Sequence, residues 1–70
     1  MDRQRVSSSN IASVGYDPTT LTLEVEFHSG SVYQYLGVPD HLYQGLMTAS
    51  SKGSYLNDHV KDRYRFRRIR

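Results

Sequence analysis

Apolar and polar residues alternate most regularly in the segment Leu21–Phe27. A two-residue period of this kind predicts a strand with one buried face. A second β-rich run, Ser31–Leu36, follows the short loop His28–Gly30, so the two runs predict a hairpin. Ahead of them, the run Ile11–Tyr16 predicts a first strand. The Asp17-Pro18 pair should end that strand, because proline restricts the residue before it and donates no hydrogen bond.

The length of the hairpin loop decides which side chains share a face of the sheet. A two-residue turn would place the two glutamates of the first strand opposite the tyrosines of the second. A three-residue loop would end on Gly30 in a left-handed conformation, and Val25 would then pair with Tyr33 on the apolar face. Leu23 would pair with Tyr35 in the same way. We favour the three-residue loop because glycine accepts positive φ and because aromatic residues pair well with aliphatic ones.

The segment after the hairpin predicts two short helices. Pro39 suits the first position of a helix. The apolar face of that helix, which should cover the sheet, consists of Leu42, Tyr43, Leu46, Met47 and Ala49. Gly53 is expected to end this helix as a left-handed cap. Ser54 is expected to cap the second helix, which Leu56 and Val60 would anchor to the core.

The end of the chain alternates again. In Arg63–Arg67, we expect Tyr64 and Phe66 to point inward and the arginines to point outward, as in a closing edge strand. The order of elements predicts an α+β fold. Its sheet would be a small antiparallel β-meander of three strands, with a candidate fourth at the C-terminus, and two short helices would pack on one face.

Seventy residues leave room for one hydrophobic core. We therefore expect a disordered N-terminal end at residues 1–5, a single domain at residues 6–66 and a basic C-terminal end at residues 67–70. The absence of cysteine excludes disulfides and thiolate metal sites, and it favours a cytoplasmic location. Neither a signal peptide nor a membrane span is expected, and no membrane partner.

The net charge of +2 is unevenly distributed. The last ten residues contain six basic residues and one acidic residue, so they carry +5 and the rest of the chain carries −3. A basic end on a mildly acidic body suggests an anionic partner such as nucleic acid, although it could also serve only to keep the protein in solution. The candidate phosphate ligands are Lys61, Arg63, Arg65, Arg67 and Arg68, with Lys52 beside a helix N-terminus as a further candidate.

No other pattern indicates chemistry. The histidines His28, His41 and His59 are not spaced as metal ligands, so we expect no metal, no cofactor and no catalytic residue. Tyr33 and Tyr35 could stack on nucleic-acid bases, but so small a domain needs its aromatic residues inside, which favours the core.

The chain resembles the KTSC domain family, which occurs at the carboxyl end of some lysyl-tRNA synthetases and as short bacterial proteins. The resemblance rests on an ordered series of residues spread over positions 6–66, including Gly15-Tyr16-Asp17, Val38-Pro39, Gly53 and Asn57. The family's central Tyr-x-Tyr motif corresponds to Tyr33 and Tyr35.

The resemblance implies RNA binding only loosely, through the synthetase association, and it implies no activity. Our leading hypothesis is a non-enzymatic module that binds RNA or another nucleic acid through the basic C-terminal residues. The alternative is a protein partner on the outer face of the sheet, where Val32, Leu36 and the two glutamates would be exposed.

Overall fold

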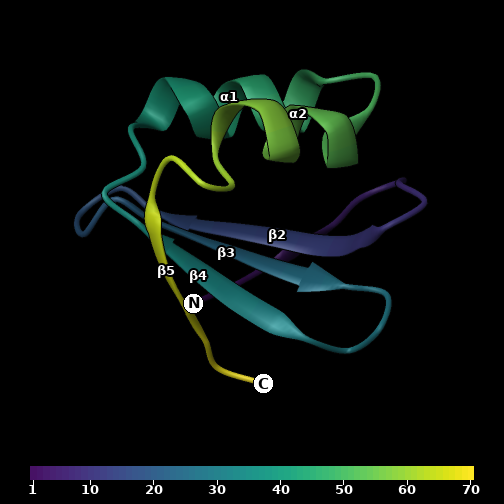
Figure 1. Cartoon of the computed structure of the whole chain (residues 1–70), viewed down its shortest axis with the longest axis horizontal. Coiled ribbons are helices and arrows are strands. Elements are labelled where there is room, and N and C mark those ends of the chain that lie inside the picture. The colour runs from purple at the N-terminus through teal and green to yellow at the C-terminus, as the bar shows by residue number, and fades with distance from the viewer.

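A computed structural model describes the whole chain, residues 1–70. A five-stranded antiparallel sheet in the order β1-β2-β3-β4-β5 lies under two helices, which pack on one of its faces (Figure 1). In chain order the elements are β1 (Gln4–Arg5), β2 (Ile11–Asp17), β3 (Thr22–Phe27), β4 (Val32–Leu36), α1 (Asp40–Thr48), α2 (Lys52–His59) and β5 (Arg65–Arg68). The predicted α+β class is confirmed, with five strands in place of three or four. Neither helix has the length and apolar character needed to cross a bilayer.

The β3–β4 hairpin has the register that the three-residue loop predicted. Val25 lies opposite Tyr33, and Leu23 lies opposite Tyr35. Gly30 ends the loop with a φ of 96°, a conformation that residues with a side chain rarely adopt. The apolar residues of β3 therefore face the helices, and the glutamates face the other side of the sheet.

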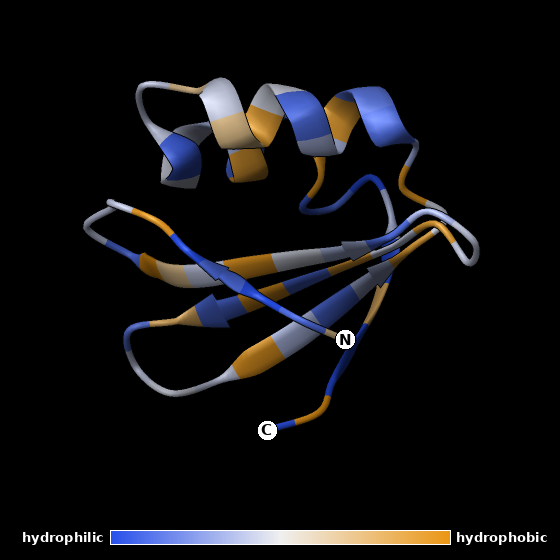
Figure 2. Ribbon diagram, turned by 180° about the vertical axis from the view of Figure 1, so that it is seen from behind, coloured by the Kyte–Doolittle hydropathy of each residue, from blue (hydrophilic) through white to orange (hydrophobic).

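The hydrophobic core lies between the sheet and the helices. Its nine buried residues are Ile11, Val14, Leu23, Val25, Tyr35, Val38, Leu46, Leu56 and Val60. Tyr16 fastens the sheet to α1, because its ring stacks on Tyr43 with centroids 4.8 Å apart and its hydroxyl donates to the Val38 carbonyl at 2.7 Å. Leu46 of α1 and Leu56 of α2 are buried in this layer. Figure 2 shows the two helices above the sheet, coloured by the hydropathy of each residue.

The junction between the helices differs from the prediction. Gly53 is not a left-handed cap but lies inside α2, which begins at Lys52. The N-cap is Ser51, whose hydroxyl accepts a hydrogen bond from the Ser54 amide at 3.4 Å. Gly53 serves packing instead of a turn, since a Cβ at this position would lie only 3.1 Å from the Asn10 side chain.

Close contact between the helices explains a second glycine. A Cβ on Gly45 of α1 would overlap the hydroxyl of Tyr55 in α2. Glycine is a poor helix former, and here its lack of a side chain gives the Tyr55 ring the space that it occupies.

The two ends of the chain also differ from expectation. Instead of fraying, residues 1–5 supply strand β1, in which Arg5 lies opposite Ser13 of β2. The chain can pass close to β2 because Gly15 has no side chain; a Cβ there would lie 2.6 Å from the Asp2 carbonyl. At the other end, the Ile69 amide donates to the Val32 carbonyl at 2.8 Å. Both ends lie on the side of the sheet away from the helices (Figures 1 and 2).

Candidate functional site

Strand β5 divides the predicted phosphate ligands between the two faces of the sheet. Arg68 lies opposite Tyr33 on the face that carries the helices, whereas Arg65 and Arg67 lie on the outer face. Arg63 precedes the strand, and its Nε donates to a backbone carbonyl near the end of α2 at 3.1 Å. The three arginines at positions 63, 65 and 67 therefore do not share one face, because the alternation begins only at Arg65.

The hydrogen bonds of these cations differ in ways that matter for binding. The Lys52 ammonium donates a hydrogen bond at 3.1 Å to the carbonyl of Ala49, the C-cap residue of α1. Arg67 uses its Nε to contact Gln34 at 2.8 Å and keeps its terminal nitrogens free. Arg65 is exposed and has no side-chain partner. Each exposed arginine on β5 therefore retains donors for an anionic ligand.

A pocket of about 320 Å³ opens between α2 and the hairpin end of the sheet. Aromatic rings from the sheet, those of Phe27, Tyr33 and Tyr35, line it together with the side chains of Asn10, Asn57 and Lys61. Ser31 is also part of the lining, and its hydroxyl accepts a hydrogen bond from Arg68 at 3.1 Å. Of the predicted phosphate ligands, Lys61 therefore lines the pocket, and Arg68 contacts one of its lining residues.

Aromatic rings continue from the pocket to strand β5. The Tyr33 ring lies edge-on to Phe27 at 5.7 Å and tilted against Phe66 at 5.5 Å. Tyr35 is only 3% exposed and belongs to the core, as predicted, whereas Tyr33 is partly buried. Phe66 lies opposite Tyr35, so it points to the helix-bearing face as expected, but it is 58% exposed on this edge strand. The sequence predicted the face on which Phe66 lies and not how far the ring is exposed.

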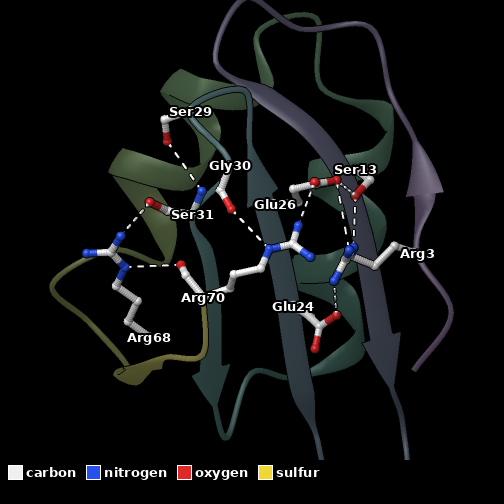
Figure 3. Close-up of polar contacts among 9 residues, drawn as sticks. All are labelled: Arg3, Ser13, Glu24, Glu26, Ser29, Gly30, Ser31, Arg68 and Arg70. Atoms are coloured by element: carbon white, nitrogen blue, oxygen red, sulfur yellow. Dashed lines mark hydrogen bonds and ion pairs between the residues drawn. The ribbon is translucent and has the colours of Figure 1, made fainter.

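Hydrogen bonds and ion pairs between side chains cover the outer face of the sheet (Figure 3). Glu24 is 4% exposed, and its carboxylate accepts hydrogen bonds from Arg3 at 2.6 Å and from Gln34 at 2.8 Å. Burial alone would raise the pKa of Glu24. The hydrogen bonds from Gln34 and Arg3 and the charge of Arg3 outweigh burial and hold the pKa below its ordinary value.

Glu26 has a basic partner from each end of the chain, because Arg3 lies 3.9 Å from its carboxylate and Arg70 lies 2.9 Å from it. Its carboxylate accepts a hydrogen bond from Ser13 at 2.8 Å and pairs with Arg70 at 2.9 Å (Figure 3). The Ser13 hydrogen bond and the nearby arginines lower the pKa of Glu26. Val32, expected to be exposed on this face, is only 1% exposed, since the C-terminal residues run beside it. The surface expected to meet a protein partner is thus largely occupied by the chain itself.

Sequence reasoning did not identify Arg3 and Arg70 as structural residues. Both stand at the ends of the chain, and nothing in their immediate sequence signals a partner. The histidines are scattered, and no three His, Cys, Asp or Glu side chains gather as a metal site.

Comparisons with known proteins agree with this fold. The sequence profile of the KTSC domain matches residues 7–64. A crystal structure of a KTSC domain protein from Yersinia pestis superposes with a TM-score of 0.95 at 45% identity, covering 99% of this chain and 97% of that one. An uncharacterized protein of Stutzerimonas stutzeri is 44% identical over 99% of both chains. A lysine–tRNA ligase of Nostoc is 39% identical over 87% of this chain, but the matched part is only 11% of the ligase.

Proposed function

The chain belongs to the KTSC domain family, and we propose that it is a non-enzymatic cytoplasmic module that binds single-stranded nucleic acid, with a preference for RNA, along strand β5. The observation that carries the proposal is the composition of this edge strand. Phe66 exposes more than half of its surface there, between arginines that keep free guanidinium donors. The preference for RNA draws on the relatives named lysine–tRNA ligase, in which a similar domain forms a small part.

Exposed aromatic residues and arginines are complementary in such a surface. Bases stack on aromatic rings regardless of sequence, with a contribution of about 1–3 kcal/mol per base. Guanidinium groups stay charged at any physiological pH and match the geometry of phosphate oxygens. Phe66 and Arg68 share one face of β5, and Arg65 and Arg67 share the other, so bases and phosphates of one strand both find partners along this edge.

The charge contribution is tested by a matched pair of variants, Arg65→Gln on edge strand β5 and Arg5→Gln on edge strand β1. Both arginines are exposed, so each change removes one charge with little effect on the fold. If three arginines of β5 each neutralise one phosphate, the slope of log affinity against log salt on a single strand is about −2. Arg65→Gln should make that slope shallower by about 0.7, and Arg5→Gln should leave it unchanged.

Fluorescence anisotropy with labelled RNA and DNA oligonucleotides over a range of salt concentrations measures both slopes. Failure of the wild-type protein to bind either nucleic acid at low salt would refute the proposal. Equal effects of the two variants would show that charge alone, without a defined site on β5, attracts the ligand.

The aromatic contribution is tested by Phe66→Ala, with Ile69→Ala as the control. Both residues are large, apolar and at least half exposed, at 58% and 50%. Loss of one stacked base predicts a decrease of about 1–3 kcal/mol in binding free energy for Phe66→Ala. Ile69→Ala should leave the affinity unchanged. Similar losses for both variants would argue against stacking on Phe66.

A protein partner on the outer face is less well supported. Val32 and Glu24, which that hypothesis required at the surface, are both buried. The outer face therefore offers mainly the charged ends of Arg3, Arg70 and their neighbours, and not the apolar centre typical of protein interfaces.

A further inference from the structure

We propose, building on the nucleic-acid function above, that the pocket between α2 and the β3–β4 hairpin receives one unpaired nucleobase of the bound strand. In this arrangement the base lies against Tyr33, its edge meets the amides of Asn10 and Asn57, and the adjoining phosphate meets Lys61. This surface lies on the helical side of the sheet, next to the part of β5 that carries Phe66 and Arg68.

The dimensions of the pocket suit a single ring system. Its volume of about 320 Å³ is at the lower end of the range of about 300–1,000 Å³ found for small-molecule sites. Three aromatic rings contribute to its lining, and the Tyr33 ring among them is only partly buried. A flat aromatic ligand can therefore stack in it, whereas a folded segment of polymer is too large.

The polar groups of the lining suit the edge of a base. Asn57 is exposed on α2 and makes no side-chain hydrogen bond within the chain. Asn10 accepts a hydrogen bond from Ser9 at 2.8 Å through its carbonyl oxygen, and its amide nitrogen is free to donate. Carboxamides offer the same pairing of donor and acceptor as the edges of nucleobases, and proteins use them to read bases.

The charge of the lining indicates an anionic ligand. Lys61 is the one basic residue in it, and no aspartate or glutamate is present. Arg68 adds a second positive charge at the rim, where it donates to Ser31. A planar ring attached to a phosphate satisfies both the aromatic rings and the cations, whereas an aromatic side chain of a peptide would satisfy only the rings.

Continuity with β5 links the pocket to the bound strand. The Tyr33 ring is shared, because it lines the pocket on one side and contacts Phe66 at 5.5 Å on the other. A single strand that stacks a base on Phe66 therefore passes the pocket opening, where a neighbouring base can enter. Single-stranded RNA presents its bases unpaired, so entry requires no opening of a duplex.

The test is an NMR titration of the full chain with adenosine monophosphate and uridine monophosphate. A second titration uses N-acetyl-tyrosinamide as a peptide-like probe. We expect the monophosphates to shift the signals of Tyr33, Asn57 and Lys61. Asn57→Ala should weaken their binding about fivefold or more, as expected for loss of one hydrogen bond. The control is Gln44→Ala, which removes an exposed amide from α1 outside the pocket and should change nothing.

Fluorescence anisotropy with oligonucleotides, compared with the monophosphate titration, separates this proposal from the proposed function. If oligonucleotides bind β5 but the monophosphates do not shift the pocket signals and Asn57→Ala has no effect, the pocket proposal is overturned and the proposed function stands. If the monophosphates bind and no oligonucleotide does, the function is overturned and the pocket remains a nucleotide site. Shifts caused by the tyrosine probe alone would overturn the nucleobase assignment in favour of a peptide side chain.

Discussion

Replacement of Arg3 by glutamine is predicted to destabilise the domain, although Arg3 is only the third residue of the sequence. The guanidinium contacts the Glu24 carboxylate at 2.6 Å and the Ser13 hydroxyl at 3.0 Å. Loss of one partner from a fully buried pair costs about 3–5 kcal/mol. The Arg3 side chain is 24% exposed and Glu24 keeps its hydrogen bond from Gln34. We therefore expect a smaller loss, of about 2–3 kcal/mol, at pH 7.

The pH dependence gives this prediction a second readout. In the wild-type protein the pKa of Glu24 is lowered, so its carboxylate contributes stability above the unfolded-state pKa, and that stability is lost as pH falls through the folded-state pKa. In the Arg3→Gln variant, burial still raises the pKa of Glu24. The hydrogen bond from Gln34 is then the main interaction that lowers this pKa. The variant should then lose less stability than the wild type as the pH falls below the ordinary pKa of a glutamate, so the difference in unfolding free energy between the two proteins should narrow on acidification.

Urea denaturation followed by far-UV circular dichroism and tyrosine fluorescence measures both effects, since the chain has no tryptophan. Arg5→Gln is the control, because it removes a neighbouring exposed charge and should change stability by less than about 0.5 kcal/mol. A stability of Arg3→Gln within that limit of the wild type at pH 7 would refute our account of the contact. A difference that widens on acidification would contradict the assignment of the effect to Glu24.

Three further expectations concern packing and metals. Tyr35→Ala should cost at least about 3 kcal/mol and could abolish folding, whereas Tyr33→Ala should cost roughly half as much because its ring is only partly buried, as urea denaturation would show. Gly45→Ala should destabilise the wild-type protein but stabilise a Tyr55→Ala variant by up to about 1 kcal/mol. A stability change of the same sign in both proteins would argue against a steric overlap between a side chain at position 45 and the Tyr55 ring. Stoichiometric zinc should leave the melting temperature unchanged, and a saturable rise would reveal a metal site.

The sheet and its register could be predicted because the information is local. Gly30 follows the strict alternation of β3 at a distance that defines a three-residue loop, and positive φ requires glycine there. The position of Gly53 could not be predicted in the same way. Its reason is a contact with Asn10, more than forty residues away in sequence, which no local pattern records.

The ends of the chain and the candidate site depended on contacts of the same long range. Arg3 lies in a polar segment that predicts disorder. Its partner Glu24 lies in β3 and comes close to Arg3 only in the folded chain. Phe66 alternates correctly with its neighbours, but alternation does not reveal that the helices stop short of β5. The resemblance directed attention to Tyr33 and Asn57, and only the folded chain shows that they line one pocket with Lys61.

The edges of the sheet have a consequence for self-association. An open edge strand can pair with another copy of the same chain and begin an aggregate. Here the two edges are short, with two residues in β1 and four in β5, and both carry arginine. Two copies that met through β5 would bring guanidinium groups together, so repulsion opposes the growth of a continuous sheet. The same repulsion would act wherever a similar domain forms a small part of a larger protein, as in the relatives named lysine–tRNA ligase.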